Sequence, residues 1–536
     1  DAWLHIKASR VRLACGEPHH TASSVFLLHG VTGSGKTEIY MRALEQAILQ
    51  GKRAIILVPE IALTPQTINR FAARFPNKVT VLHSKLSPGE QFDVWQQVRD
   101  GLFDVIIGSR GALFAPQPDL GLIVIDEEHE WTYKQHDASP HYHARDVALK
   151  LAELTNSVVI LGSATPDVTS YYRAQNGEFQ LLELPERISA GKISPLPSVE
   201  VVDLRRELQE GNRSIFSRSL TKSITETLSA REQVILFLNR RGTATFVQCR
   251  DCGFVLHCRR CDTPLTYHEN EDMLLCHHCN YRVKTPRICP ECGGKRIKFL
   301  GIGTQKVAEE ASSAFPGARL LRWDHDVVRG KHSHERIMEQ FLAHKADILI
   351  GTQMVAKGLD MPLVSVVGVI NADIGLYIPH FRSSERTFQI LAQVAGRAGR
   401  SKSRGKAIIQ TYTPEHYAIV AAACHDYSTF YEQEIAFRHQ QGNPPFNHLV
   451  HLVYSHTNAA VCQKEAARTY NILQQEIDFL GLLDTSLLGP SPAFSQRVRG
   501  KYRWQIIIRS PDPSPLLSRS NFPQGWSIDI DPVSLI

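Results

Sequence analysis

Short apolar runs alternate with stretches of helical periodicity along the first part of the chain. Between the first two runs, Met41, Leu44 and Ile48 share one helical face, and Gly51 follows where a helix would end. Such runs are typical of parallel strands that helices bury on both faces, so they predict a doubly wound α/β lobe. The runs are SVFLLHG (24–30), RAIILVPE (53–60), DVIIGS (104–109), LIVIDE (122–127) and SVVILGSAT (157–165).

A second set of apolar runs predicts a second α/β lobe, and a cluster of cysteines interrupts it. The runs are VILFLNRRG (234–242), ADILIGTQ (346–353), VVGVINAD (366–373) and KAIIQTY (406–412). Strand-like stretches near the C-terminus predict an additional α+β domain. The predicted boundaries are 1–23 for the remnant of a preceding region, 24–190 for lobe 1, 191–248 with 293–428 for lobe 2, 249–292 for a cysteine-rich insertion and 429–536 for a C-terminal domain.

Composition narrows the class of protein without deciding it. A chain of 536 residues is too long for one core, and its net charge of +6 permits nucleic acid as a partner without requiring it. No apolar run approaches the roughly 18 residues of a membrane span, and no secretory signal opens the chain. The first residues read like the middle of a protein, so we expect part of the natural chain to be missing.

A phosphate-loop pattern, G-x-x-x-x-G-K-[ST], stands between the first apolar run and the first helix, as the motif requires. The glycines let backbone N–H groups converge on phosphate oxygens at a helix N-terminus. Lys36 is predicted to reach the β- and γ-phosphates of ATP, and the Thr37 hydroxyl to hold Mg²⁺. The predicted ATP-binding residues are Gly30, Val31, Thr32, Gly33, Ser34, Gly35, Lys36 and Thr37.

Two further groups of residues complete the predicted catalytic set. Asp126, at the end of an apolar strand, is the expected Mg²⁺ carboxylate, and Glu127 the expected base for the attacking water; the alternative is an acidic strand cap. In QVAGRAGR, the arginines suit a γ-phosphate contacted from lobe 2, and the alternative is a solvated basic helix face. If both lobes contribute, hydrolysis moves one lobe against the other. The lobe 2 residues are Gln393, Arg397 and Arg400.

Several loops are suited to a phosphate chain, and each is a weak signal alone. Thr64 before Pro65 predicts an exposed helix N-terminus, as does Thr165 before Pro166. Arg110 and Lys357 lie in glycine-bearing loops. Close after the Mg²⁺ carboxylate come Trp131 and Tyr133, on which bases could stack regardless of sequence; the alternative is that the rings fill core. On an ATPase, these loops together favour nucleic acid, and RNA stays open.

Eight of the eleven cysteines form four C-x-x-C pairs in a chain without secretory context, which favours two Cys₄ Zn²⁺ sites over disulfides. A hairpin turning at 270–272 would bring the two inner pairs together, leaving the outer pairs for the other site; a cross-braced arrangement is the alternative. Four thiolates leave no open position, so both sites are expected to be structural. Zinc site 1 is Cys249, Cys252, Cys289 and Cys292, and zinc site 2 is Cys258, Cys261, Cys276 and Cys279.

The C-terminal stretch RVRGKYRWQIII (497–508) alternates basic and apolar residues. Read as one strand, it has a basic face on which Arg499, Lys501 and Arg503 are predicted to contact the DNA backbone. The alternative is an edge strand whose charges only guard against aggregation.

Together these motifs resemble a superfamily 2 helicase and, more narrowly, the PriA family of bacterial replication-restart helicases. Four cysteine pairs inside lobe 2 make the resemblance more specific than the helicase motifs alone. The matching segments are GVTGSGKTEIY (30–40), VPEIALTPQ (58–66), DEEH (126–129), YKQ (133–135), YHARD (142–146), GSATP (162–166), LNRRG (238–242), GTQMVAKG (351–358), FRSSERTFQ (381–389), QVAGRAGR (393–400), RWQII (503–507) and DIDP (529–532).

The resemblance implies two RecA-like lobes, 3′→5′ movement on single-stranded DNA, and unwinding of stalled or repaired forks that starts primosome assembly. Implied partners are single-strand-binding protein through its acidic tail, other primosome proteins and the replicative helicase or its loader, in the bacterial cytoplasm near the nucleoid. Two departures matter: the family's N-terminal 3′-end-binding and winged-helix domains have no counterpart, and no adenine-reading glutamine segment is evident in residues 1–29. The rival functions are a duplex DNA translocase and a primosome-loading scaffold with a weak ATPase.

Overall fold

The structure is a computed structural model that divides into two compact units, one running to Leu196 and the other beginning at Pro197. Among the described residues, no helix combines the length and the apolar character needed to cross a lipid bilayer. The described residues are 24–535 apart from 61–63, 85, 137, 190–191, 240–245, 261–262, 269–272, 277–279, 300–302, 325–332, 354, 356–360 and 400–404.

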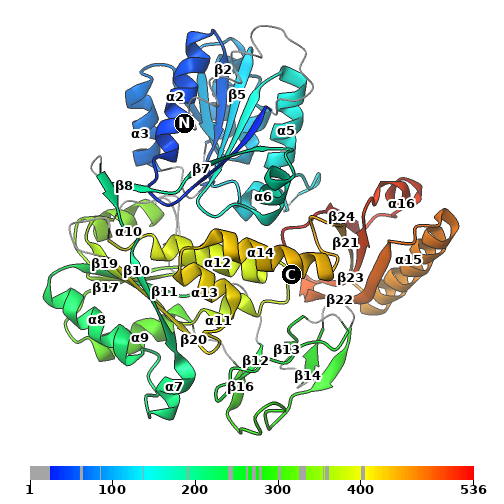
Figure 1. The fold of residues 1–536 in the computed structure, drawn as a ribbon. Coiled ribbons are helices and arrows are strands. Elements are labelled where there is room, and N and C mark those ends of the chain that lie inside the picture. The colour runs from blue at the N-terminus through cyan, green and yellow to red at the C-terminus, as the bar shows by residue number, and fades with distance from the viewer. Residues whose placement is uncertain are drawn as a thin grey trace. The chain divides into compact units, whose positions relative to one another are not determined.

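Unit 1 is a parallel sheet of seven strands in the order β3-β4-β2-β5-β6-β1-β7, with helices on both faces (Figure 1). Helices α2 and α3 pack on one face, where Tyr40, Leu44 and Phe71 join the buried core. The strands are β1 (Val25–Gly30), β2 (Arg53–Leu57), β3 (Val79–Leu82), β4 (Val105–Gly108), β5 (Leu120–Asp126), β6 (Val158–Ser163), β7 (Gln180–Leu184), β8 (Arg187–Ser189) and β9 (Lys192–Ser194). The helices are α2 (Lys36–Leu49), α3 (Pro65–Arg74), α4 (Pro88–Arg99), η2 (Arg110–Phe114), η3 (Trp131–Tyr133), α5 (Ala144–Thr155) and α6 (Val168–Gln175).

Unit 2 contains a second parallel sheet, in the order β10-β20-β19-β11-β18-β17, so the predicted two α/β lobes are confirmed. Leu220, Ile224 and Val307 pack α8 and α9 against this sheet. The strands are β10 (Ser198–Asp203), β11 (Gln233–Phe237), β17 (Leu320–Trp323), β18 (Ile348–Gly351), β19 (Val364–Val369) and β20 (Lys406–Thr411). The helices are α7 (Leu204–Gln209), α8 (Arg218–Ser229), α9 (Thr304–Ala314), α10 (Ser333–Leu342), α11 (Asp373–Leu376), α12 (Ser383–Ala395), α13 (Tyr417–Ala423) and α14 (Tyr427–Gln440).

The cysteine-rich insertion leaves lobe 2 after β11 and returns before α9. Strands β12 and β16 form a two-stranded antiparallel ladder at its base, and β13, β14 and β15 form a small sheet. The predicted hairpin is confirmed by the pairing of Thr266 with Leu275. The strands are β12 (Val247–Cys249), β13 (Thr266–His268), β14 (Met273–Leu275), β15 (Arg282–Lys284) and β16 (Ile297–Phe299).

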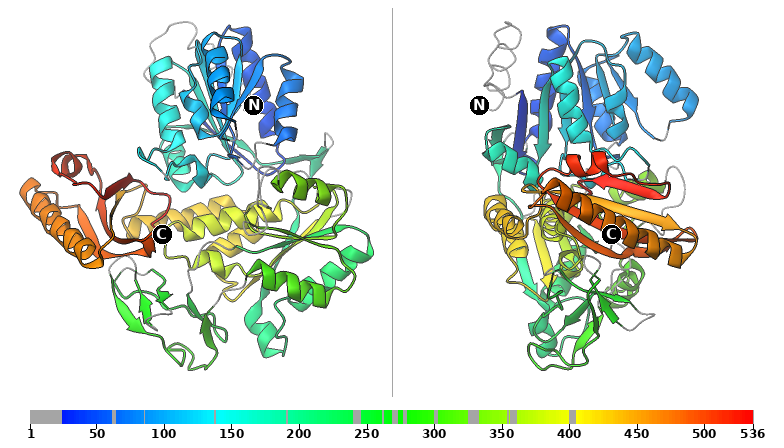
Figure 2. Two further views of the ribbon diagram at one scale, coloured as in Figure 1. Left: turned by 180° about the vertical axis from the view of Figure 1, so that it is seen from behind. Right: turned by 90° about the vertical axis from the view of Figure 1, so that its right-hand side faces the viewer.

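The C-terminal domain is a four-stranded antiparallel sheet in the order β22-β23-β21-β24, with the long helix α15 along one face (Figure 2). Leu473 and Ile477 of α15 bury this face with Val450 and Ile508. Phe381 of lobe 2 packs against Leu449, Ile507 and Leu535 of this domain. The elements are β21 (His448–His456), α15 (Ala459–Leu480), β22 (Ser486–Val498), β23 (Lys501–Ser510), α16 (Ser514–Arg519) and β24 (Trp526–Ile530).

Candidate ATP, nucleic-acid and zinc sites

The phosphate loop curls between β1 and α2, as predicted. Lys36 begins α2, and its Nζ donates to the carbonyl oxygens of Gly30 at 2.6 Å and Val31 at 3.5 Å. Gly35 has a φ of 91°, a left-handed backbone that glycine adopts without strain. Thr37 lies in the first turn of α2. The N-terminus of α2 and the Lys36 ammonium group therefore place positive charge at the loop, as binding of a triphosphate would need.

Asp126 and Glu127 lie at the carboxyl end of β5. The Tyr40 hydroxyl donates to Asp126 Oδ1 at 3.0 Å. A Cβ at position 162 would collide with this hydroxyl, so the contact requires the glycine that stands there. Burial, and then the charge of Glu127, raise the pKa of Asp126 to about 6, against the opposing effect of Lys36. A bound divalent cation would favour the charged carboxylate. Glu127 has a φ of 50°, a left-handed backbone value that is uncommon for a residue with a side chain.

A buried ionic cluster joins the next residue, Glu128, to the start of α6. Glu128 is 1% exposed, and its two carboxylate oxygens accept from the Asp167 N–H at 2.7 Å and the Ser170 hydroxyl at 2.8 Å. Arg145 of α5 lies between the two acids, with its Nη1 3.5 Å from Glu128 and 3.3 Å from Asp167. Glu128, which lies just beyond the end of β5, is therefore bonded to the segment that follows β6.

That segment differs from its prediction. Thr165-Pro166 does not start a helix; instead Asp167 caps α6 by accepting from two N–H groups of the first turn. The Thr165 N–H donates to Ser163 Oγ at 2.9 Å, and His129 Nδ1 lies 2.7 Å from the same oxygen. The physical reason is that the Asp167 carboxylate is the better capping group at this position. By contrast Thr64 is the N-cap of α3, with its Oγ1 accepting from Thr67 N at 3.3 Å, as predicted.

The aromatic loop, residues 131–143, follows directly on this strand end. Tyr133 is only 1% exposed, and its hydroxyl donates to the Asp126 carbonyl oxygen at 2.7 Å. A ring buried this far offers no face to a base, so the prediction that Tyr133 stacks on DNA is wrong for this structure; the ring fixes the loop instead. Trp131 is partly exposed, and its ring lies 5.5 Å from that of His136. Its contact with DNA stays a prediction.

Arg110 also holds the aromatic loop. Its Nη1 donates to the carbonyl oxygens of Thr132 at 3.0 Å and Lys134 at 3.3 Å. A guanidinium that donates to these carbonyl oxygens positions the loop. Contact between Arg110 and the DNA backbone stays a prediction, and the contacts of Arg110 do not support it. The loop is thus bonded both to η2 and to the carboxyl end of β5, which sequence spacing alone could not reveal.

The lobe 2 residues lie at the end of α12. Gln393 is 6% exposed on the helix, and Arg397 is 7% exposed beyond the helix's last residue, Ala395. The alternative of a solvated basic helix face is therefore wrong for Arg397, because its side chain is buried and off the helix. The predicted Arg400, like Lys357, lies outside the described residues.

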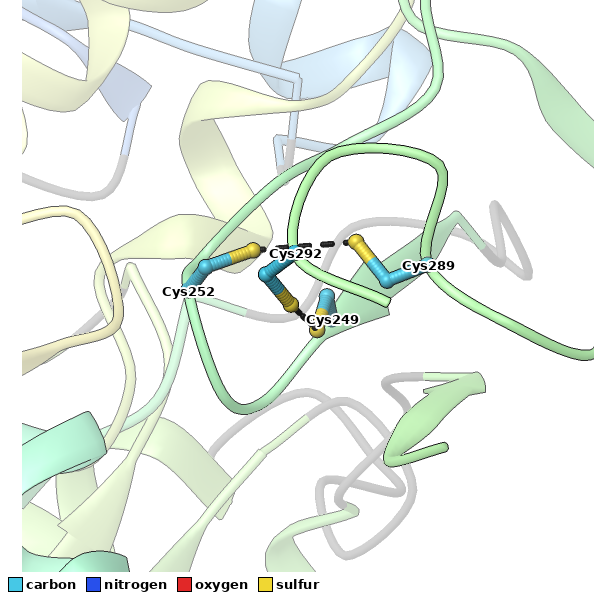
Figure 3. Close-up of side chains that lie close together, drawn as sticks. All are labelled: Cys249, Cys252, Cys289 and Cys292. Atoms are coloured by element: carbon cyan, nitrogen blue, oxygen red, sulfur yellow. Dashed lines mark hydrogen bonds between the residues drawn. The ribbon is translucent and has the colours of Figure 1, made fainter. Parts of the chain in front are cut away.

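Zinc site 1 is assembled as predicted from the outer cysteine pairs (Figure 3). All four sulfur atoms lie within 4.8 Å of one another, with Sγ–Sγ distances of 3.7 Å for Cys249 to Cys292 and for Cys252 to Cys289. A tetrahedron with Zn–S bonds of about 2.3 Å has edges of about 3.8 Å, so the residues fit Zn²⁺. A disulfide needs about 2.05 Å and is excluded in this arrangement.

Zinc site 2 is only partly visible. Cys258 and Cys276 are buried in one cluster within the insertion, as the predicted pairing of inner knuckles requires. Their partners Cys261 and Cys279 lie outside the described residues. The assembled outer quartet contradicts the cross-braced alternative for the first site, and a second Zn²⁺ stays a prediction.

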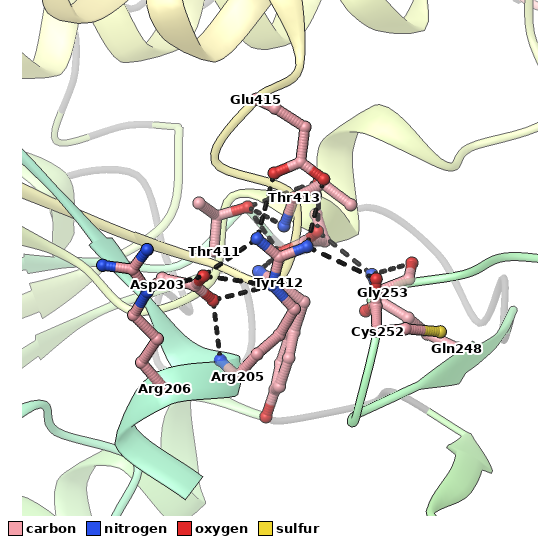
Figure 4. A network of polar contacts seen from close by, with 11 residues as sticks. Asp203, Arg205, Arg206, Gln248, Cys252, Gly253, Thr411, Tyr412, Thr413 and Glu415 are labelled. Carbon is pink, nitrogen blue, oxygen red and sulfur yellow. Dashed lines mark hydrogen bonds and ion pairs between the residues drawn. The ribbon is translucent and has the colours of Figure 1, made fainter. Parts of the chain in front are cut away.

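Two contacts fasten the first zinc knuckle to lobe 2 (Figure 4). Arg205 donates to the Cys252 carbonyl oxygen at 3.4 Å and to both oxygens of Glu415 at 3.1 Å, while Asp203 accepts from the same guanidinium; we name this set the Arg205 bridge. A Cβ at Gly253 would meet the Tyr412 carbonyl oxygen, so only glycine allows this approach.

A buried carboxylate, that of Asp373, also joins the base of the insertion to lobe 2. Asp373 is fully buried and accepts from Gln248 Nε2 at 3.1 Å, Thr413 Oγ1 at 2.8 Å and the Tyr412 N–H at 2.8 Å. Burial raises the pKa of Asp373, and these donors oppose the rise. Neither set could be predicted from the sequence, because nothing in the spacing relates residue 205 or 373 to the cysteines.

The basic C-terminal stretch is a hairpin and not one strand. Arg499 and Gly500 have φ of 50° and 81°, which form a two-residue turn between β22 and β23. The turn breaks the predicted alternation: Arg497 pairs with Tyr502 and lies 5.2 Å from its ring centroid, so it is not on the face of Lys501. Arg499 and Lys501 are exposed at the tip, and Arg503 is half-buried, which lowers its pKa.

Comparisons with known proteins agree with this architecture. The DEAD/DEAH box helicase model matches residues 17–173 and the helicase conserved C-terminal domain model matches 310–402. Between and beyond them, the PriA DNA helicase Cys-rich region domain matches 258–284 and the primosomal protein N C-terminal domain matches 439–533. The two helicase models fall on the two parallel sheets, and together with the phosphate loop they define a two-lobed helicase.

Curated relatives narrow the class. The replication restart protein PriA of Bacillus subtilis is 48% identical over 90% of this chain and 59% of its own length, and that of Synechocystis is 44% identical over 95% and 62%. The protein of the same name from Treponema pallidum is 39% identical over 96% of this chain and 78% of its own length. The chain belongs to the PriA family of replication restart proteins. It spans about 60% of the length of the first two relatives.

Proposed function

We propose that this chain is an ATP-dependent DNA helicase that moves 3′→5′, unwinds stalled or repaired replication forks and initiates primosome assembly. Family membership and the two helicase models support the class of activity. The observation that carries the proposal is the bond from Tyr133 to the Asp126 carbonyl oxygen. This bond fixes a loop that carries a partly exposed tryptophan to the residue expected to hold Mg²⁺. A base that contacts the loop could therefore affect ATP hydrolysis through the loop itself.

Residues of the phosphate loop, of the end of β5 and of lobe 2 have different roles in the proposed hydrolysis. Lys36 binds the phosphates, and Thr37 and Asp126 would hold Mg²⁺, which when bound neutralises the charge that develops on the phosphate oxygens. Glu127, beside Asp126, orients and deprotonates the attacking water. From lobe 2, Arg397 supplies a guanidinium suited to a γ-phosphate. The Arg397→Ala variant tests that last role.

Other parts of the chain are assigned by their chemistry. Trp131 stacks on a base, while Thr64, Arg499, Lys501 and Arg503 contact the DNA backbone. The insertion holds two structural Zn²⁺ ions and divides the strands or docks a partner. Single-strand-binding protein, through its acidic tail, and other primosome proteins, including the replicative helicase or its loader, are the proposed partners.

The deciding experiment is strand displacement on a forked DNA with ATP and Mg²⁺, comparing the chain with Glu127→Gln. We expect displacement that the variant lacks, because the variant retains the shape of the site but not the base. Hydrolysis stimulated by DNA without displacement would replace the proposal with the duplex translocase. DNA binding with neither activity would replace it with the scaffold.

Polarity has its own test. Partial duplexes with a single-stranded tail on one side report direction, since a 3′→5′ motor loads on the 3′ tail. We expect displacement from the 3′-tailed duplex only. Equal or preferential displacement from the 5′-tailed duplex would contradict the proposed direction while leaving the helicase class intact.

A further inference from the structure

The phosphate loop is bonded to the chain that follows β7, and we name residues 184–188 the β7–β8 segment. The Val31 N–H donates to the Leu184 carbonyl oxygen at 3.1 Å, and the Ile188 N–H donates to the Gly33 carbonyl oxygen at 2.9 Å. Leu184 ends β7 and Ile188 lies in β8, so both bonds are made within unit 1. The backbone of the loop is therefore held at two points by residues outside the phosphate-loop motif.

Arg187, the first residue of β8, lies against this loop. It is only 6% exposed. A Cβ at Gly33 would lie 3.3 Å from Arg187 Cγ and 3.5 Å from its Nε, so the arginine side chain runs along the glycine. Successive side chains of a strand point to opposite faces, and the next residue, Ile188, is accordingly 52% exposed. Strand β8 thus buries the arginine against the loop and leaves the isoleucine side chain in solvent.

A buried arginine in this place adds to the positive charge of the phosphate loop. Its guanidinium is always charged, and it joins two other positive groups, the Lys36 ammonium and the N-terminus of α2. A triphosphate is strongly anionic, and a cation held close to it away from bulk water strengthens its binding. Gly33 belongs to the part of the site that would hold the phosphates before and during hydrolysis. The arginine should therefore contribute to binding more than to the chemical step.

We propose that Arg187 is a further nucleotide-binding residue, whose guanidinium the β7–β8 segment places beside the phosphate loop to bind the triphosphate of ATP. The inference rests on the proposed function, since it presumes that the loop binds ATP. Spacing in the sequence does not relate residue 187 to the motif at 30–37. The fold does, because β7 pairs with β1 and sets Leu184 opposite Gly30.

The test is equilibrium titration of the chain with a fluorescent ATP analogue and Mg²⁺, which requires no DNA. Arg187→Lys and Arg187→Met both keep a straight stem beside Gly33 and differ in charge. We expect Arg187→Met to raise the dissociation constant by about tenfold, the scale of one lost charged hydrogen bond. Arg187→Lys should keep more of the affinity, since it retains the charge but not the planar fork. The matched control is Arg173→Met, because Arg173 pairs with Glu178 on a partly exposed surface of unit 1.

Steady-state hydrolysis separates a binding role from a merely structural one. Loss of a contact made equally in the ground state and the transition state raises KM and leaves kcat unchanged. We expect this pattern for Arg187→Met, with KM raised by about tenfold. An arginine that only stabilises the fold would lower kcat through the folded fraction and leave KM as it is. That second pattern, with an unchanged dissociation constant, would overturn the inference.

Further outcomes distinguish failure of this inference from failure of the proposed function. If both Arg187 variants bind the analogue as tightly as the unaltered chain while Lys36→Ala does not, Arg187 has no part in binding and the ATP site stands. Equal weakening by Arg187→Lys and Arg187→Met would show that the charge is not used, which also overturns the inference. If the unaltered chain binds no analogue, the inference and the proposed function both fall.

Discussion

Arg145 in unit 1 and Arg438 in unit 2 are both buried between two carboxylates, yet the two clusters differ. Arg438 is fully buried and bonds Glu434 at 2.8 Å and Glu385 at 2.7 Å. Arg145 is 8% exposed and lies farther from its acids, at 3.3 and 3.5 Å. Burial raises the pKa of Glu434, as it does for Glu128 beside Arg145, so both clusters rely on the arginine to keep buried carboxylates charged.

The difference lies in what each cluster joins. The Arg438 cluster fastens α14 to α12, and the Tyr417 hydroxyl closes it by donating to Glu434 at 2.6 Å. The acids of Arg145 also accept from the backbone and from Ser170, so they have donors of their own. A tight, closed cluster favours one arrangement of helices. A looser one, close to the end of β5, can be rearranged at smaller cost, which suits the movement between lobes that the proposed function requires.

The largest expected effect is on the stability of unit 2. Arg438→Ala leaves Glu385 and Glu434 buried without their cation, which should destabilise the unit by about 3–5 kcal/mol. Urea unfolding followed by circular dichroism measures it. The control is Arg468→Ala, whose ion pair with Glu465 is exposed and should contribute less than about 1 kcal/mol. Equal losses in the two variants would contradict the comparison.

Arg145→Ala should act on activity more than on stability. We expect DNA-stimulated ATP hydrolysis to fall by about tenfold, because Glu128 and Asp167 lose the group that aligns them, while unfolding changes by about 1–3 kcal/mol. Steady-state hydrolysis with and without single-stranded DNA measures it. Lys150→Ala, on the same helix with an exposed partner, serves as the control. A stability loss as large as that of Arg438→Ala, with unchanged hydrolysis, would remove the distinction between the clusters.

The Arg205 bridge is a third, partly exposed arginine cluster and should show an intermediate pattern. Arg205→Ala should reduce strand displacement by a few-fold while zinc content and DNA-stimulated hydrolysis stay near normal, since it frees the knuckle from lobe 2 without touching a thiolate. Its contribution to stability should not exceed about 1 kcal/mol. The adjacent Arg206 is 81% exposed, so Arg206→Ala is the matched control. Loss of zinc from Arg205→Ala would refute this role.

The smallest effect is that of pH, to which the arginines do not respond. Burial lowers the pKa of His416 to about 4. The unfolded chain binds a proton near pH 6.5 and the folded chain does not, so stability falls as pH drops from 6.5 towards 4 and is unaffected above that window. Between pH 8 and 6 the loss that comes from His416 alone should be about 1 kcal/mol. His416→Asn, which can still cap α13, should lessen this slope; an unchanged slope would assign it to other groups.

Prediction from sequence succeeded where local spacing decides the outcome. The phosphate loop, the outer two C-x-x-C pairs and the long apolar runs are local patterns, and among the described residues they lie where expected. The short strands β3 and β7 were not predicted, because their residues are only partly buried. Arg145, Arg438 and Tyr133 were misjudged or missed because burial of a charge or a ring depends on partners distant in sequence. Gly500 did indicate the turn at Arg499-Gly500, but the interpretation of residues 497–508 as one strand overlooked it.

The ladder at the base of the insertion has a consequence for how such a chain can change. Val247 on the way in pairs with Phe299 on the way out, so the two ends of the insertion are neighbours. A change in the length or sequence of the chain between them therefore leaves the strand order and the connections of the six-stranded sheet unchanged. The insertion can therefore lengthen, shrink or be exchanged between lineages as a cassette, provided that Gln248 keeps its bond to Asp373.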